Sequence, residues 1–107
     1  MIDSRQHVIG KYIPYAFETI TVAATAIGLT TSTTYLNSTP KPKKVFITVE
    51  SAQLRYRIDG VADPTSTVGH VMVPTQSLTL EGYSQLNNFK AIRTGSTSAT
   101  LQVTYLR

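Results

Sequence analysis

Apolar and polar residues alternate along most of this chain after residue 17, with the period of two that a β-strand produces. The clearest case is 54–59, where apolar residues at even positions alternate with charged residues at odd positions. Turn clusters rich in Gly, Pro, Asn, Asp and Ser separate these runs. The predicted strands are 18–24, 26–29, 45–49, 54–59, 71–73, 77–80, 89–93 and 99–105, and 84–88 is predicted to form a single helical turn.

One predicted strand, 45–49, carries bulky side chains on both of its faces. Val45, Ile47 and Val49 share one face, while Phe46 and Thr48 share the other. A strand of this kind is central in its sheet or covered on each side, because neither face is suited to water.

The first 16 residues do not continue the strand pattern. Their apolar side chains are interrupted by Gly10 and Pro14, so the segment is apolar enough to be buried but too broken for a core element. Such segments are often ordered only against a neighbour. We therefore predict two parts, an extended N-terminal arm at 1–16 and a β domain at 17–107.

Seven or eight short strands, with turn signals about every 8 to 12 residues, are typical of a sandwich or a small barrel. The length of 107 residues fits one domain, and the abundance of Ser, Thr and Tyr favours strands over helices. We predict an all-β fold, a single compact antiparallel β-sandwich of jelly-roll or immunoglobulin-like type.

The net charge of +4 comes from basic residues that are spread thinly, with one cluster at 41–44. Because no basic face interleaved with stacking aromatics is evident, we do not expect nucleic-acid binding. A chain without Cys forms neither disulfides nor thiolate metal sites. The N-terminus lacks the regions of a secretory signal, and no apolar run approaches the roughly 20 residues of a membrane span. We expect a soluble protein made in the cytoplasm, with no membrane partner.

Residues that could carry chemistry are few. His7 and His70 lack metal-ligand spacing, the acidic residues are scattered, and no Ser stands in a Gly-x-Ser-x-Gly frame. His70 could join Asp59 or Asp63 across a loop as a ligand or an acid–base pair, but a loop His beside a Gly is more often a surface or interface residue. We therefore expect no enzymatic activity, no metal and no cofactor.

Basic and aromatic positions are stronger candidates for contacts with other proteins. Arg55 and Arg57, with Arg93 on a later strand, could form an anion-binding row, but we favour pairing with acidic residues or contacts between proteins. Tyr56 and Tyr105 fall on inward faces and are predicted to lie in the core, whereas Tyr residues in the arm and loops are typical interface anchors. The predicted interface residues are Ile9, Tyr12, Ile13, Tyr15, Tyr35, Arg55, Arg57 and Tyr83.

An ordered set of motifs resembles small virion-associated proteins of tailed bacteriophages. The motifs lie at 20–22, 26–31, 45–50, 54–60, 63–65, 68–70, 78–80, 88–95 and 99–105. The resemblance covers nearly everything after the arm. The order of the motifs is specific, but the resemblance does not specify which role in the virion the protein has. It implies a compact β-sandwich and a structural role in the virion, and it brings no catalytic residues with it.

On that resemblance we expect a capsid decoration or cement protein on the outside of the phage head. It would form a homo-oligomer, with a trimer favoured, and bridge subunits of the major capsid protein while the arm lies along the shell. Burial of the apolar arm side chains there would contribute roughly 1.5 to 3 kcal/mol each. A head–tail junction or tail component is the alternative within the virion. A module that binds host glycans is the alternative from another class, although the chain lacks the Trp that carbohydrate sites often use.

Overall fold

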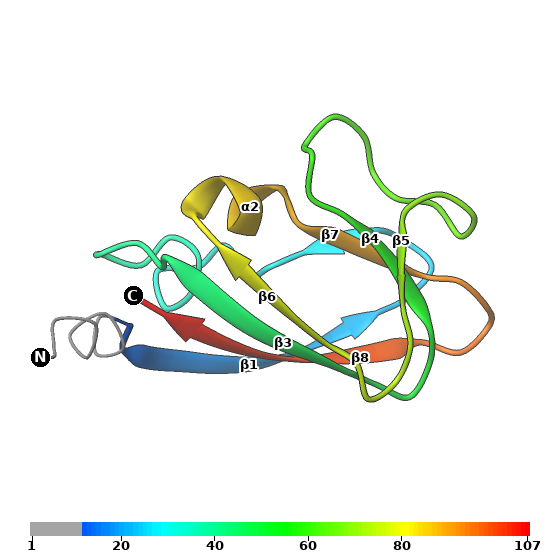
Figure 1. The fold of residues 1–107 in the computed structure, drawn as a ribbon, viewed down its shortest axis with the longest axis horizontal. Coiled ribbons are helices and arrows are strands. Elements are labelled where there is room, and N and C mark those ends of the chain that lie inside the picture. Colours follow the sequence, from blue (N-terminus) through cyan, green and yellow to red (C-terminus); the bar gives the residue numbers. More distant parts are fainter. Residues whose placement is uncertain (1–11) are drawn as a thin grey trace, which may run out of the picture.

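Eight strands and one short helix make up the part of the chain that the computed structural model describes, residues 12–107. The elements in chain order are β1 (Pro14–Val22), β2 (Ile27–Gly28), β3 (Lys44–Glu50), β4 (Leu54–Arg57), β5 (His70–Met72), β6 (Ser77–Glu81), α2 (Tyr83–Asn88), β7 (Lys90–Arg93) and β8 (Ala99–Leu106). The strands form two four-stranded sheets that face each other (Figure 1). Sheet A has the order β1-β8-β3-β6 and sheet B the order β2-β7-β4-β5. The prediction of an all-β antiparallel sandwich is confirmed.

The pairing of the strands identifies the type of sandwich. β1 pairs with β8, β2 with β7, β3 with β6 and β4 with β5, always antiparallel. The eight strands therefore form one long hairpin, which is wound so that β3 also pairs with β8 and β4 with β7. A double sheet of eight strands in this arrangement is a jelly roll. An immunoglobulin-like sandwich would divide its strands differently between the two sheets.

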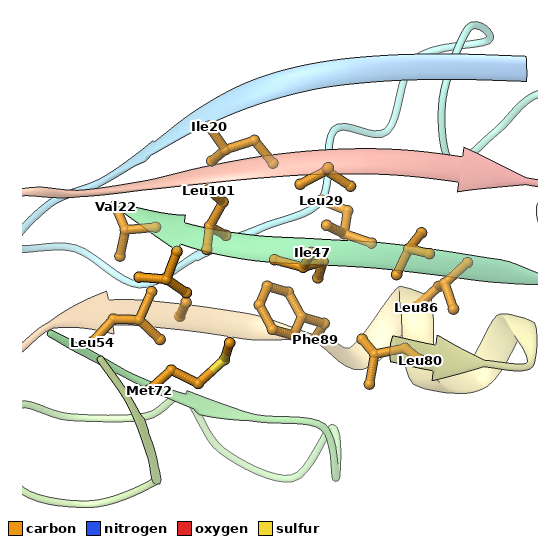
Figure 2. Close-up of a cluster of buried hydrophobic side chains, with 14 of the residues drawn as sticks. Ile20, Val22, Leu29, Ile47, Leu54, Met72, Leu80, Leu86, Phe89 and Leu101 are labelled. Atoms are coloured by element: carbon orange, nitrogen blue, oxygen red, sulfur yellow. The ribbon is translucent and has the colours of Figure 1, made fainter. Parts of the chain in front are cut away.

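The core lies between the two sheets because alternate residues of each strand point inward. In β8 every second residue from Ala99 to Tyr105 is buried. Side chains from both sheets, from α2 and from the segment just before β7 meet in one cluster, with Phe89 near its centre (Figure 2). Tyr105 is fully buried as predicted, and the half-buried Tyr56 packs against the cluster with its ring 5.8 Å from the ring of Phe89.

Strand β1 begins inside the segment that was predicted to be an arm. Residues 14–16 belong to β1, and Ile13 extends the pairing through backbone hydrogen bonds of 2.8 and 3.0 Å with Arg107. The pattern in this segment is broken because the register shifts between Pro14 and Ala16, as in a β-bulge. Pro14 is accommodated because it is the first residue of an edge strand, where a missing N–H costs no ladder bond.

The other predicted elements match the structure with shifted ends. Strand β3 is central in sheet A, as predicted for a strand with bulk on both faces. Helix α2 coincides with the predicted helical turn at 84–88 and adds Tyr83 at its start. Strand β4 ends at Arg57, two residues before the predicted end, and the chain then enters the long connection to β5.

Candidate interaction surface

The outward face of sheet A is formed by four strands and carries two exposed phenylalanines. We call it the open face. It consists of the outward-pointing residues of four strands, because their inward-pointing neighbours form the core. These residues are Phe17, Thr19 and Thr21 of β1, Lys44, Phe46, Thr48 and Glu50 of β3, Ser77, Thr79 and Glu81 of β6, and Thr100, Gln102, Thr104 and Leu106 of β8.

Two phenylalanines lie in one row across the open face. The strand register pairs Thr104 with both Phe17 and Phe46, and pairs Phe46 with Thr79. Phe17 is 57% exposed and Phe46 is 45% exposed. Each ring therefore presents a large apolar surface to solvent, and the rings are about two strand spacings, roughly 10 Å, apart. Phe46 faces outward as its place in the alternation predicted, but the described part of the chain does not bury it.

The next row on the same face contains no large side chain. It consists of Thr19, Gln102, Thr48 and Ser77, which the register aligns across the four strands. The hydroxyl of Thr19 donates to the Gln102 side chain at 2.7 Å. The open face thus has an aromatic row next to a row of short, uncharged polar side chains.

Charged side chains lie only toward the two ends of the open face. Lys44 and Glu81 form an ion pair of 3.5 Å at one end. Glu50 lies at the other end, where the Gln102 amide donates to its carboxylate at 3.2 Å. A centre that is aromatic and uncharged, with charges around it, is the composition found in the cores of protein interfaces.

Two predicted interface residues, Tyr12 and Ile13, lie near the Lys44 end of sheet A. The Lys44 ammonium is 4.7 Å from the centre of the Tyr12 ring, so Tyr12 adds apolar surface beside the aromatic row. Ile13 is 61% exposed, but it pairs with Arg107 and so belongs to the opposite side of the sheet from Leu106. Ile9, the remaining apolar residue predicted from the arm, lies outside the described residues.

Two other predicted interface residues, Tyr15 and Tyr35, are placed against the core. The Tyr15 hydroxyl donates to the Tyr35 carbonyl at 3.1 Å, and the Tyr35 ring lies 5.2 Å from the ring of Tyr105. The Tyr35 hydroxyl donates to the Phe17 carbonyl at 3.4 Å. These contacts hold the 29–43 connection at one end of the sandwich, at the left in Figure 1. Only the exposed parts of these two half-buried side chains remain available to a partner.

The same end of the sandwich contains an acidic residue that the sequence pattern did not single out. Glu18 occupies an inward-facing position of β1, and its carboxylate accepts hydrogen bonds from the Tyr105 hydroxyl and from the backbone N–H and side-chain hydroxyl of Thr30. Burial, reinforced by the adjacent Glu18 carboxylate, raises the pKa of Tyr105. The sequence did contain a signal for this position. Glu18 is two and four residues before the buried Ile20 and Val22, so the alternation of the strand places it on the same inward face.

The outward face of sheet B is partly covered by a connection, although Val71 of β5 remains 44% exposed on it. Arg55 points out of this sheet and donates to the carbonyls of Ser66 and Gly69, at 3.2 and 2.7 Å. Pro64 is buried, and Asp63 pairs with Lys90 at 3.4 Å. The 58–69 connection therefore lies over the outward side of sheet B, seen at the upper right in Figure 1.

The three arginines do not form the anion-binding row that was considered. The register pairs Arg55 with Ile92 and Leu54 with Arg93, so Arg93 belongs to the opposite face of sheet B. Arg93 donates to the Ser98 hydroxyl at 3.3 Å. Arg57 forms a two-point ion pair with Asp59, and its hydrogen bonding lowers the pKa of Asp59.

The last predicted interface residue, Tyr83, joins α2 to the 29–43 connection. Its hydroxyl lies 3.4 Å from the side-chain oxygen of Asn37, and the Lys41 ammonium lies 5.4 Å from its ring centre. Tyr83 is half-buried, so part of its ring stays accessible beside the Lys cluster.

A hollow of about 400 Å³ lies between the end of β4 and the start of β5. It is lined by Arg57, Ile58, Asp59, Val68, Gly69 and His70. The structure therefore brings Asp59 and His70 to one hollow, whereas Asp63 faces Lys90. Within residues 12–107, no three His, Cys, Asp or Glu side chains gather as they would around a metal ion.

Comparison with protein-family models, with curated proteins and with solved structures gave no match for this chain. None of the helices in the described part of the chain has the length and apolar character needed to cross a membrane.

Proposed function

We propose that this protein is a structural component of a phage virion, a decoration or cement protein on the outside of the head. It assembles as a homo-oligomer and bridges subunits of the major capsid protein. The observation that supports this proposal best is the open face of sheet A, with Tyr12 at one end of it.

The open face is suited to protein contact for physical reasons. Phe17 and Phe46 are aromatic side chains on a rigid sheet, so burying them costs little conformational entropy. Each Å² of apolar surface removed from water contributes roughly 25 cal/mol, and the uncharged centre adds no large desolvation cost. An exposed aromatic row on a rigid sheet is therefore suited to a structural protein that acts by binding other proteins.

The jelly-roll fold agrees with this role but does not decide it. Jelly rolls occur in viral capsid domains and also in lectin domains and cupins. One fold hosts many functions, so the open face and the sequence resemblance to phage virion proteins, not the fold, support this role. A head–tail junction or tail component would use the same surfaces and remains the alternative within the virion.

One observation favours a second candidate function, the binding of host glycans. The hollow beside β5 combines a planar Arg57–Asp59 pair with the His70 ring and the apolar side chains of Ile58 and Val68. Polar groups of this kind bind sugar hydroxyls, and apolar side chains pack against the C–H face of a sugar ring. Retention of the protein on host surface polysaccharide, lost in an Asp59→Asn variant, would support this candidate.

Binding to capsids tests the main proposal. Empty heads of the phage that encodes the chain, prepared without this protein, are mixed with it and pelleted. We expect the protein to co-sediment with the heads and to raise their melting temperature. A variant lacking residues 1–11 keeps all of β1, and it should bind the heads at least about tenfold more weakly.

The controls separate attachment from the fold. Far-ultraviolet circular dichroism of the shortened variant should match that of the full chain, since β1 begins at Pro14. Unchanged binding by the shortened variant would show that the arm is not the attachment segment. If the full chain does not bind heads but is retained on tail fractions, the result would favour a tail component over a head decoration protein.

A further inference from the structure

We propose that the open face of sheet A pairs with the open face of a second copy of this chain about a two-fold axis. The proposal specifies which surface joins two copies, a surface whose strand residues are not among the interface residues predicted from the sequence, although Tyr12 lies at its edge. It rests on the geometry of sheet A and stands whether or not the protein belongs to a phage head.

The charges at the two ends of the open face suit such a pairing. Lys44 and Glu50 lie on the same side of β3, three residues before and three residues after Ile47. A two-fold axis that crosses the strands at the level of Ile47 places Lys44 of each copy opposite Glu50 of the other. Each Lys44 then lies between the Glu81 carboxylate of its own copy and the Glu50 carboxylate of the other, so opposite charges meet across the two-fold interface.

The side-chain sizes suit the same axis. Because the axis passes between the aromatic row and the row of short side chains, each row lies opposite the other row of the second copy. Phe46 then faces Thr48 across the interface, and Phe17 faces Thr19. Large side chains opposite small ones let two sheets pack about 10 Å apart with interdigitated side chains.

These features select a second copy over a different protein. A partner surface of one charge would be matched best by a face of one sign, whereas the open face carries both signs, with the Lys44–Glu81 pair at one end and Glu50 at the other. The central rows contain no charge, so they repel no copy of themselves. A second copy of the chain presents the same surface, so it offers the small side chains and the opposite charges that this face would contact.

The size of the open face sets the expected strength of the pairing. Four strands about 4.8 Å apart, and the run from Lys44 to Glu50, cover roughly 15 by 20 Å. Stable interfaces bury about 800 Å² on each partner, so this face, at roughly 300 Å² per copy, is smaller than that class and suits a weak, transient pairing. We expect a dissociation constant of roughly 0.1 mM, so the dimer forms only where copies are concentrated.

Sedimentation velocity of the full chain tests this inference. Between about 1 µM and about 1 mM, we expect a concentration-dependent shift from monomer to dimer. Phe46→Thr keeps a residue that favours strands, and it should weaken the dimer about tenfold or more. Val61→Thr is the matched control, because Val61 is 82% exposed in the 58–69 connection, and it should leave the dimer unchanged.

Charge reversal tests the two-fold geometry itself. Lys44→Glu and Glu50→Lys should each weaken the dimer about three- to fivefold, and the double variant should return to within about threefold of the original protein. Denaturation of each variant, followed separately, reports any change in the fold, including loss of the pairing between Lys44 and Glu81.

Several results would overturn the pairing. They are a chain that stays monomeric up to about 1 mM, a dimer that Phe46→Thr leaves intact, a trimer, or a dimer that appears only after residues 1–11 are removed. The last result would mean that the N-terminal residues occupy the open face. Capsid binding is measured separately. A dimer that does not bind heads would contradict the proposed function but not the pairing, and a monomer that binds heads would contradict the pairing but not the proposed function.

Discussion

The two sheets of this sandwich face one core, to which the longer strands of sheet A supply most of the buried side chains, and their outward faces differ. Sheet A has longer strands, and its outward side carries two exposed phenylalanines, Phe17 and Phe46. Sheet B has short strands, and the 58–69 connection lies over its outward side, held by Arg55. Exposure of a sheet face in this fold is therefore decided by where the connections lie, not by the alternation within the strands.

The comparison also explains what each face can do. On the outward face of sheet B, the Arg55 guanidinium donates hydrogen bonds to the carbonyls of Ser66 and Gly69. These polar groups therefore find partners within the chain and do not need water. The connection next to sheet A, 29–43, lies at the end of the sandwich beside Tyr105 and leaves the aromatic row uncovered. The open face is thus a part of the described chain whose aromatic side chains are free to contact another molecule.

The largest expected effect separates a core aromatic from an open-face aromatic. Phe89→Ala should lower the free energy of unfolding by about 3 to 5 kcal/mol, because Phe89 is only 1% exposed between the sheets. Phe46→Ala should cost less than about 1.5 kcal/mol in dilute solution. Urea denaturation of both variants measures the difference. Equal losses would mean that the open face is already covered in the dilute protein.

Loosening the cover of sheet B should have the next largest effect. Arg55→Met keeps the apolar stem but removes two hydrogen bonds to the 58–69 connection, and it should cost about 1 to 3 kcal/mol. Hydrogen exchange should become faster in 58–69 by more than in β8, where it follows only the loss of global stability. Arg57→Met is the control, because the Arg57–Asp59 pair is a surface ion pair. Similar exchange in both variants would show that Arg55 does not hold the cover.

Removing the Tyr105 hydroxyl should have a smaller effect that depends on pH. Tyr105→Phe leaves Glu18 with its hydrogen bonds from Thr30, so the cost near neutral pH should be about 1 kcal/mol. The pKa of Tyr105 is raised in the folded protein, so ionisation favours the unfolded chain once the pH exceeds about 10. Unfolding measured between about pH 8 and 11 should show a smaller alkaline loss in the variant. An identical loss would place the alkaline sensitivity elsewhere.

The smallest expected effect concerns the edge of the covered face. The pKa of Asp59 is lowered by its hydrogen bonds with Arg57, so this pair stabilises the fold above the ordinary Asp pKa of about 3.9 and ceases to do so as the pH falls below it. Asp59→Asn should slightly flatten the acid side of the stability curve, and Glu81→Gln provides a comparison from the ion pair of sheet A. Thermal melts at neutral pH and near pH 3 measure both. A large loss at neutral pH in Asp59→Asn would contradict a merely local role.

Much of the local structure could be predicted because it depends on neighbouring residues alone. The alternation at 99–105 predicts a strand with Tyr105 inward, and the turn residues before it set where that strand begins. The prediction failed at 14–16, where an irregularity in the register hides the period of the strand. It also missed Glu18, because an acidic residue on an inward face is explained only by its partners Thr30 and Tyr105.

Relations between strands could not be read in the same way. Arg55 and Arg93 looked alike in the sequence, yet the register of β4 with β7 places them on opposite faces of sheet B. Within one strand, odd and even positions reliably point to opposite faces of the sheet. Between strands, the length of the turn can change which of the two sets faces the core. The packing of Tyr35 on Tyr105 likewise joins residues 70 positions apart in the chain.

By itself, the sequence determined the all-β class, the position of most strands, and which side chains of each strand share a face, because a period of two is a local property of an extended backbone. Only the tertiary structure decided that the sandwich is a jelly roll and that Arg55 is covered while Phe17 and Phe46 are open. These features depend on which strands pair and where the long connections lie. Both are set by packing of the whole core rather than by any short stretch of the chain.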